Sequence, residues 1–331
     1  MAEAMKDHIA ILGAGAWGTA LAMQAERAGQ RAMLWARDPA RAALIQQSRA
    51  NERLLPGVAL PAGITITADA AEALTGAALI LLVVPAQALR PVLQSLPALP
   101  APVLICAKGV EAGSLMLPLE ILAATHPGVT SGVLSGPNFA HEIARGLPAA
   151  AVVASHDAGL RALGVARLGS AGFRLYGGDD PVGAEIGGAA KNVIAIAAGA
   201  VMGAGLGENA RAALITRGLA EIARLALALG GRADTVAGLS GLGDLLLTAT
   251  GPGSRNTSLG IALGRGENLA DILAARQGVT EGVATAPALV ARAASLGVAL
   301  PICTAVAELV SGKVTLQEAV GRLLARPQRD E

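Results

Sequence analysis

The chain has 331 residues, of which 53% are hydrophobic and 15% charged, and its 26 basic and 25 acidic side chains leave a formal net charge of +1. This length and hydrophobic content indicate two folded domains of roughly 150 residues each, and they exclude a disordered chain or a disulfide-stapled miniprotein. The balanced charge offers no basic surface for nucleic acid or an anionic membrane. Aromatic residues make up only 2% of the chain, which disfavours stacking platforms for single-stranded nucleic acid.

Two cysteines, Cys106 and Cys303, stand in or beside apolar runs. This placement is typical of buried thiols in a reducing compartment and predicts a cytoplasmic protein. A membrane-spanning helix needs about 18 or more apolar residues in succession, and no segment has that many. The longest candidate, residues 193–206, is expected to be a buried core helix, and no export signal is expected at the start of the chain.

From residue 7 to about residue 180, short apolar runs alternate with amphipathic segments, a pattern typical of a parallel sheet flanked by helices. Strands are expected at residues 8–12, 31–35, 64–67, 79–84, 102–106, 132–134 and 149–154. After Pro181 the apolar period becomes about 3.6 residues, which predicts helices at 210–229, 284–296 and 316–324. The pattern therefore predicts an α/β domain with a parallel-rich sheet over residues 1–180 and an all-α domain over residues 181–331.

A glycine-rich segment, Gly13-Ala-Gly15-Ala-Trp-Gly18, directly follows the first strand and opens a helical pattern over residues 19–28. Gly13 allows a tight turn, Gly15 lets the backbone approach a pyrophosphate, and Gly18 permits close packing of helix on strand. The helix N-terminus would supply amide donors to the phosphates. Spacing and context together predict a dinucleotide site; the alternative is that the glycines only form a tight turn.

The end of the second strand, Leu34-Trp-Ala-Arg37-Asp38, bears on the choice of cofactor. Arg37 stands where NAD-selective sites usually place an acidic residue, and its guanidinium suits a 2′-phosphate. NADP should therefore be accepted, while Asp38 one residue later leaves NAD open. The alternative for Arg37 is a cap on the following helix.

Lysine is scarce, with four lysines against 22 arginines, so a lysine inside an apolar motif suggests chemistry that arginine cannot perform, such as giving up a proton. Lys108 follows an apolar strand, at the edge where ligands bind in open α/β folds. Lys191 precedes a long apolar segment, where a desolvated amine suits proton transfer near neutral pH. For each, the alternative is a surface lysine whose stem covers apolar surface.

The helical half contains two short polar segments within apolar sequence. The segment 239–248 places Asp244 and Thr248 at i and i+4 on one helix face, and Ser254-Arg255-Asn256 forms a donor-rich group suited to a phosphate. Taken singly, Asp244 could be a helix cap and Arg255 a solvated charge. The four histidines and two cysteines show no metal-ligand spacing, so no catalytic metal is expected.

These ordered motifs resemble the NAD(P)-dependent glycerol-3-phosphate dehydrogenases of the bacterial type, over nearly the whole chain. The matching segments are residues 13–22, 83–85, 108–111, 135–140, 191–192, 238–248, 254–256 and 279–282. The resemblance implies a Rossmann-like N-terminal domain and a helical C-terminal domain like that of 6-phosphogluconate dehydrogenase, with the active site between them. It also implies hydride transfer between NADH or NADPH and dihydroxyacetone phosphate, which supplies glycerol 3-phosphate for phospholipid synthesis.

The resemblance further implies residue roles, with Lys191 as proton donor and acceptor and Arg255 at the substrate phosphate. The implied catalytic residues are Lys191, Lys108 and Asp244. Substrate binding would involve Lys108, Gly136, Asn138, Lys191, Asp244, Ser254, Arg255 and Asn256. Cofactor binding would involve Gly13, Gly15, Ala16, Trp17, Gly18, Arg37, Lys108, Ala140, Arg255, Val279 and Glu281. The chain departs from the family pattern at Ala16, where Ser is frequent, at Asn138, where bacterial members have Ser or Thr, and at Leu54, where Tyr is common.

Two other functions are alternatives to this one. A two-domain reductase for a hydroxy acid or a ketopantoate-like substrate would need a carboxylate site and has no use for the segment 254–256. A catalytically silent dinucleotide sensor could lose its lysines, yet this chain keeps both Lys108 and Lys191. Apolar helical faces can pack within a chain or between chains, which leaves a homodimer open.

Overall fold

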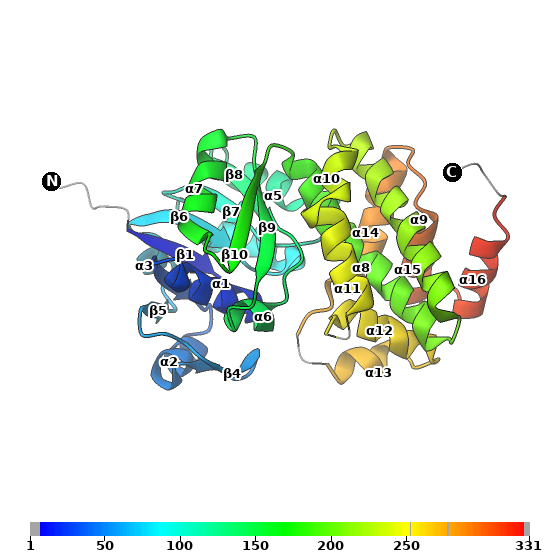
Figure 1. Cartoon of the computed structure of the whole chain (residues 1–331), viewed down its shortest axis with the longest axis horizontal. Coiled ribbons are helices and arrows are strands. Elements are labelled where there is room, and N and C mark those ends of the chain that lie inside the picture. Colours follow the sequence, from blue (N-terminus) through cyan, green and yellow to red (C-terminus); the bar gives the residue numbers. More distant parts are fainter. Residues whose placement is uncertain (1–6, 252, 277, 328–331) are drawn as a thin grey trace. The chain divides into compact units, whose positions relative to one another are not determined.

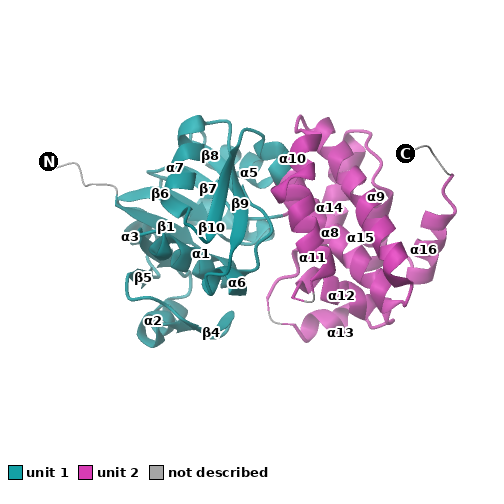
Figure 2. Ribbon diagram, viewed as in Figure 1, with its two compact units in different colours: residues 1–108, 117–184 teal, residues 109–116, 185–331 magenta. Residues whose placement is uncertain are grey.

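The computed structural model describes residues 7–251, 253–276 and 278–327 (Figure 1). Contacts within the chain divide it into two compact units (Figure 2). The sheet unit comprises residues 1–108 and 117–184, and the helical unit comprises residues 109–116 and 185–331. The predicted boundary after residue 180 falls just before the last change between units, while residues 109–116 group with the helices.

One eight-stranded sheet forms the centre of the sheet unit, in the order β10-β9-β8-β7-β6-β1-β2-β5. Its neighbouring strands run parallel except β8 and β9, which pair antiparallel. The strands are β1 (His8–Leu12), β2 (Arg31–Trp35), β5 (Ile64–Thr67), β6 (Ala77–Leu82), β7 (Val103–Ile105), β8 (Ser131–Ser135), β9 (Ala149–Ala154) and β10 (Phe173–Gly178). The parallel-rich sheet and the seven predicted strands are confirmed, and β10 is an additional edge strand.

Helices flank the sheet and explain its apolar strands. β1 and β6 are buried along their whole length, because helices cover strands of this kind on both faces. The helices are α1 (Ala16–Arg27), α2 (Pro39–Ser48), α3 (Ala70–Leu74), α4 (Leu89–Ser95), α5 (Pro118–Thr125), α6 (Ala140–Ala144) and α7 (Ala158–Leu168), with a 3-10 turn η1 (Ala86–Ala88). An antiparallel hairpin of β3 (Ala50–Asn51) and β4 (Leu55–Ala59) follows α2.

The helical unit contains most of α8 and every helix after it, as predicted. Its elements are α8 (Pro181–Gly203), α9 (Gly207–Ala228), α10 (Ala233–Ala237), a π-helical turn η2 (Leu239–Gly243), α11 (Asp244–Thr250), α12 (Arg255–Gly264), α13 (Leu269–Ala274), α14 (Glu281–Ser295), α15 (Pro301–Val310) and α16 (Leu316–Leu324). By length and composition α8 could cross a membrane, but 89% of its most apolar window is buried inside the protein. Such burial is typical of a core helix.

Helices α8 and α12 pack with their backbones in contact. Gly199 and Gly203 on α8 face Gly260 and Gly264 on α12, at a spacing of four residues on both helices. A Cβ atom added at Gly260 would lie 2.0 Å from the Ile196 carbonyl oxygen. Only glycine permits this approach, which fixes the position of α12 relative to α8.

Both cysteines are free and buried, as predicted. Burial raises the pKa of the Cys106 thiol to about 12. Burial also raises the pKa of Cys303 well above its ordinary value, and the nearby carboxylate of Glu221 adds to that rise. Glu221 on α9 accepts hydrogen bonds from the backbone amides of Ile302 (2.7 Å) and Cys303 (3.2 Å), which joins α9 to the first turn of α15.

Candidate active site

The glycine-rich loop between β1 and α1 has the geometry that its spacing predicts. Gly13 adopts φ +125°, and a Cβ atom there would lie 2.5 Å from the Val83 carbonyl oxygen. A Cβ atom at Gly18 would lie 1.8 Å from the Gly13 carbonyl oxygen, so helix and loop are in backbone contact. Gly15 has no atom within 4 Å of an added Cβ and is the N-cap of α1, without a side-chain cap. An open backbone at an uncapped helix start fits a dinucleotide pyrophosphate.

Two side chains that the sequence analysis did not single out hold this loop in place. The Asn51 amide donates to the Ala14 carbonyl oxygen at 3.1 Å and to the Thr19 hydroxyl at 2.7 Å. The Arg41 guanidinium also donates to the Ala14 carbonyl oxygen. The loop is therefore positioned from α2 and from the β3–β4 hairpin, while Ala16 and Trp17 lie half-buried in the first turn of α1.

Arg37 lies exposed just after β2, and the cap of the next helix is a different residue. The Asp38 carboxylate accepts hydrogen bonds from the amides of Ala40 (3.0 Å) and Arg41 (3.4 Å) and so caps α2. The alternative that Arg37 caps α2 is wrong, because a helix start offers N–H donors that need an acceptor. Arg37 stays available for a ligand at the carboxyl edge of the sheet.

Lys108 and the segment after β8 form a second polar group in the sheet unit. The Lys108 ammonium donates to the Gly136 carbonyl oxygen at 3.1 Å. Gly136 has φ +149°, and a Cβ atom there would lie 2.9 Å from Ala151 Cα, so only glycine fits. The Asn138 amide donates to the Ala150 carbonyl oxygen at 3.4 Å, and Ala140 begins α6 nearby in the chain.

Two buried oxygen atoms of this segment have no hydrogen-bond partner among the described residues: Asn138 Oδ1 and Ser135 Oγ. Buried polar atoms are nearly always hydrogen-bonded. Two unpartnered oxygen atoms in one segment therefore indicate a place where a polar ligand would donate hydrogen bonds to them. Asn138 was predicted for the site, whereas Ser135 was not assigned a role. The Ser135 hydroxyl directly before Gly136 was the available signal, because Ser135 ends a strand at the ligand-binding edge of the sheet.

Lys191 is central to the polar group in the helical unit. Its ammonium donates to Asp244 Oδ1 at 2.5 Å and to the Thr248 hydroxyl at 2.8 Å. Lys191 is 8% exposed and Asp244 only 1%. The Thr248 hydroxyl lies 3.4 Å from the same Asp244 oxygen, which confirms that residues 244 and 248 share one helix face.

The position of Lys191 differs from the prediction in one respect. It lies inside α8, which begins at Pro181, rather than at the start of a helix. The glycines before it do not break the helix, because Gly187 meets the backbone of η2: a Cβ atom there would lie 2.7 Å from the Ser240 carbonyl oxygen. Close packing of α8 on η2 therefore accounts for a glycine at position 187.

Asp244 is the first residue of α11, and its N-cap is Gly243. Its carboxylate contacts Lys191 instead of capping the helix, so the capping alternative is wrong. A single buried charge without a partner would be strongly destabilising. The buried ammonium and the buried carboxylate therefore have to be in direct contact. Asp244 thus fixes the position of the Lys191 nitrogen and balances its charge.

Ser254 and Asn256 have structural partners that their predicted roles did not include. The Ser254 hydroxyl accepts from the Thr257 amide at 3.2 Å and caps α12. The Asn256 amide donates to Asn192 Oδ1 at 2.8 Å, and Asn256 Oδ1 accepts from the Gly282 amide at 3.1 Å. Asn256 thereby ties α12 to the residue after Lys191 and to the start of α14.

Arg255 is exposed and lies beside the segment that contains Val279 and Glu281. A Cβ atom at Gly278 would lie 2.6 Å from Arg255 Nη1, so the guanidinium lies against this glycine. Val279 is 47% exposed, and Glu281 begins α14. The structure therefore brings Arg255 and residues 278–281 together, as their shared assignment to the cofactor requires.

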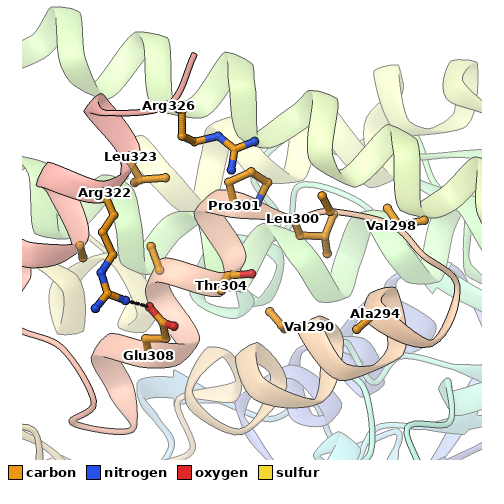
Figure 3. A pocket seen from close by; sticks show the side chains of 13 residues that line it. Val290, Ala294, Val298, Leu300, Pro301, Thr304, Glu308, Arg322, Leu323 and Arg326 are labelled. Atoms are coloured by element: carbon orange, nitrogen blue, oxygen red, sulfur yellow. Dashed lines mark hydrogen bonds and ion pairs between the residues drawn. The ribbon is translucent and has the colours of Figure 1, made fainter. Parts of the chain in front are cut away.

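A cavity of about 420 Å³ lies among α14, α15 and α16 (Figure 3). Its walls are mostly apolar and include Val290, Leu300 and Pro301, and an ion pair of 2.9 Å joins Glu308 and Arg322 at its side. None of the predicted site residues lines it. Its lining contains no lysine and thus no lysine–carboxylate pair like that of Lys191 and Asp244, so it is not the reaction site.

A dinucleotide loop after the first strand of a parallel-rich sheet, with a buried lysine–carboxylate pair in a helical unit, defines a nicotinamide-dependent oxidoreductase. Two family models match the chain: the N-terminus of NAD-dependent glycerol-3-phosphate dehydrogenase over residues 8–160 and its C-terminus over residues 180–321. The chain belongs to the NAD-dependent glycerol-3-phosphate dehydrogenase family.

Individual relatives agree with this family. A glycerol-3-phosphate dehydrogenase (NAD(P)+) from Rhodospirillum rubrum is 54% identical over 328 residues, which are 98% of this chain and 94% of the relative. One from Acidiphilium cryptum is 55% identical over 324 residues, 98% of either chain. A crystal structure of glycerol-3-phosphate dehydrogenase from Coxiella burnetii has a TM-score of 0.92 and 37% identity, covering 98% of this chain and all of its own. The resemblance seen in the sequence is confirmed.

Proposed function

We propose that this protein is an NAD(P)-dependent sn-glycerol-3-phosphate dehydrogenase that interconverts dihydroxyacetone phosphate and glycerol 3-phosphate. The observation that carries the proposal is Lys191, a buried lysine whose nitrogen lies 2.5 Å from Asp244 and 2.8 Å from Thr248. Reduction of a ketone needs a proton donor at the carbonyl oxygen, and the reverse reaction needs a base at the same place. Lys191 supplies both.

Reduction of the ketone needs one hydride and one proton, and the Lys191 nitrogen supplies the proton. Reduced nicotinamide, held through its dinucleotide at the loop of Gly13, Gly15 and Gly18, would supply the hydride that C2 of dihydroxyacetone phosphate receives. The Lys191 ammonium protonates the oxygen on C2, which becomes the hydroxyl of glycerol 3-phosphate, and the neutral amine then takes a proton from solvent. Asp244 and Thr248 hold the nitrogen in one place throughout, so little reorganisation is needed during proton transfer.

Binding roles follow from the polar groups of each unit. In the helical unit we assign the substrate phosphate to Arg255 and further substrate contacts to Asp244, Ser254 and Asn256. In the sheet unit we assign substrate contacts to Lys108, Gly136 and Asn138, whose orphan Oδ1 accepts a substrate hydroxyl. We assign cofactor contacts to Gly13, Gly15, Ala16, Trp17, Gly18, Arg37, Lys108, Ala140, Arg255, Val279 and Glu281.

At the level of the whole chain, we assign residues 1–180 to nucleotide binding and residues 181–331 to substrate binding. The buried free thiols support action in the cytoplasm, where cysteines stay reduced. Glycerol 3-phosphate made there would supply phospholipid synthesis.

The function is tested by the absorbance of reduced nicotinamide when purified protein is mixed with dihydroxyacetone phosphate and either NADPH or NADH. We expect oxidation that depends on the substrate. The control is ketopantoate, with which we expect no oxidation. Oxidation with ketopantoate alone would favour the hydroxy-acid reductase, and no oxidation by a protein that still binds dinucleotide would favour the silent sensor.

Arg255→Ala is expected to weaken the use of phosphorylated substrate. Loss of a charge-assisted hydrogen bond of about 1.5–3 kcal/mol lowers kcat/KM for dihydroxyacetone phosphate by roughly ten- to a hundredfold. The rate with unphosphorylated dihydroxyacetone, which we expect to be low, should be affected much less. Arg265→Ala, which removes an exposed arginine at the other end of α12, is the matched control and should change neither rate. Equal losses for both substrates with Arg255→Ala would show that Arg255 does not bind the phosphate.

A further inference from the structure

Two polar side chains in the last turn of α1 have no role in the assignments above. Gln24 is 2% exposed, and Arg27 ends the helix at the protein surface. The Arg27 guanidinium donates to Gln24 Oε1 at 3.1 Å, which holds the two side chains together. Figure 1 shows that α1 lies beside the short helix α6. The pair therefore stands at the end of α1 that is remote from the glycine-rich loop.

Arg27 binds the C-terminal end of α6. Its Nη1 donates to the Ile143 carbonyl oxygen at 3.0 Å, and its Nη2 donates to the Ala144 carbonyl oxygen at 2.7 Å. A Cβ atom at Gly146, which has φ +74°, would lie 3.4 Å from Arg27 Nε, so the guanidinium also lies against the turn that ends α6. The last carbonyl groups of a helix have no amide partner within it, and a planar guanidinium can satisfy two of them at once. Arg27 therefore fixes the end of α6 to α1.

Gln24 makes a similar contact with the end of α7. Its Nε2 donates to the carbonyl oxygen of Leu168, the last residue of α7, at 2.9 Å and to the Ser170 hydroxyl at 3.1 Å. Buried Leu21, Ile143 and Leu168, one from each helix, belong to the same apolar core. The pair thus joins the C-terminal ends of α6 and α7 to α1 over a shared core.

The position of α6 matters because this helix directly follows the segment that we assign to substrate and cofactor. Asn138 precedes α6 by two residues, and Ala140 is its first residue. Helix α6 has five residues, and isolated helices shorter than about 12 residues are marginal in water. Tertiary contacts such as those of Arg27 therefore hold α6 in place, and with it the residues just before it.

We propose that Arg27 is a positioning residue for the reaction: by binding the C-terminal carbonyl groups of α6, it holds residues 136–140 in place relative to the glycine-rich loop. The inference rests on the proposed function, because it assumes that this segment contacts the substrate. Arg27 acts at a distance, since α1 has 12 residues and is thus about 18 Å long. It lies at the far end of α1 from the pyrophosphate position and is not a catalytic residue.

The first test is the steady-state kinetics of Arg27→Ala at saturating NADPH. The KM for dihydroxyacetone phosphate should rise about tenfold, the effect of losing one or two hydrogen bonds to the substrate. The kcat should stay within about threefold of wild type, because Lys191 keeps its partners and remains the proton donor. The Kd for ADP, which has a pyrophosphate but no nicotinamide, should change less than about twofold, because Arg41 and Asn51 hold the loop independently.

A double-variant cycle tests whether Arg27 acts through the segment that precedes α6. In an Asn138→Ala background, Arg27→Ala should raise the KM further by less than about threefold, because the group that it positions is already gone. Arg27→Lys, which can still donate to the end of α6, should recover part of the wild-type KM. Arg174→Ala, which removes an exposed arginine on β10, is the matched control and should leave the KM unchanged.

An unchanged KM in Arg27→Ala, or equal rises in the wild-type and Asn138→Ala backgrounds, would overturn the proposal. Arg27 is exposed, so its variants are expected to fold, which thermal melting checks. Amide hydrogen exchange over residues 136–144 should be faster in Arg27→Ala, and this measurement needs no turnover. Faster exchange in the variant of a protein that does not oxidise NADPH with dihydroxyacetone phosphate contradicts the proposed function only. Turnover by the wild type, with the same KM and the same exchange in the variant, contradicts the role of Arg27 only.

Discussion

Lys191→Ala is expected to lower kcat for the reduction of dihydroxyacetone phosphate by about two to four orders of magnitude, the usual effect of losing a general acid and base. The Kd for NADPH should change little, because Lys191 is assigned to the substrate and to proton transfer and not to the cofactor. The substitution also leaves Asp244 as an unpaired carboxylate at 1% exposure, which would cost about 3–5 kcal/mol of folding stability. Lost activity alone therefore would not identify the chemical role.

A double variant separates chemistry from stability. Lys191→Met with Asp244→Asn removes both charges while keeping similar shapes, so it should melt close to the wild-type temperature and still lack turnover. Lys313→Ala removes an exposed lysine elsewhere in the helical unit and is the matched control, with unchanged kcat. The measurements are kcat, NADPH binding by fluorescence, and thermal melting. Wild-type turnover in the double variant would remove Lys191 from the mechanism.

Gly260→Ala is expected to destabilise the helical unit by about 3 kcal/mol or more, at the upper end of the overpacking range. The new Cβ atom would lie 2.0 Å from the Ile196 carbonyl oxygen and 2.8 Å from the Ala200 amide nitrogen. Both contacts are with backbone, so no flexible side chain can move aside. Helix α12 must shift away from α8, which displaces Arg255 and Asn256 relative to Lys191 and should also lower kcat/KM.

The measurement is the denaturant concentration at half-unfolding, compared with Gly321→Ala. Gly321 lies in α16 with no atom within 4 Å of an added Cβ. Its replacement should leave stability unchanged or raise it by up to about 1 kcal/mol, since alanine favours a helix over glycine. If the two variants unfolded at the same denaturant concentration as the wild type, the backbone contact between α8 and α12 would be wrong.

The sequence predicted the parts of the fold that local pattern determines. β1 and β6 are recognisable because helices bury both of their faces, which leaves uninterrupted apolar runs. β10 was not predicted because it is an edge strand with exposed Arg174 and Tyr176 and ends in two glycines, just before the predicted domain boundary at residue 180. β3 has only two residues, too few to show any alternation.

In the site, too, features that depend on residues close in the sequence were predictable, whereas contacts between distant residues were not. The spacing of Gly13 and Gly18 predicted their close contact, because an added Cβ atom at Gly18 would meet the Gly13 carbonyl oxygen, whereas the approach of Gly13 to Val83 became visible only in the fold. The bond between Lys191 and Asp244 joins residues 53 positions apart, and its geometry became visible only in the fold. The support of the loop by Arg41 and Asn51 left no periodic signal at all, because a single side chain that reaches a distant carbonyl does not change a hydrophobic pattern.

The burial of both native thiols has a practical consequence for work in solution. Because the pKa of Cys106 rises to about 12 and that of Cys303 lies well above its ordinary value, neither forms the thiolate that reacts with maleimide at neutral pH. A cysteine placed at an exposed position such as Arg174 or Lys313 would then be the reactive one in the folded protein. A fluorophore attached at such a position would label one chosen unit of the folded protein, without any need to replace the native cysteines.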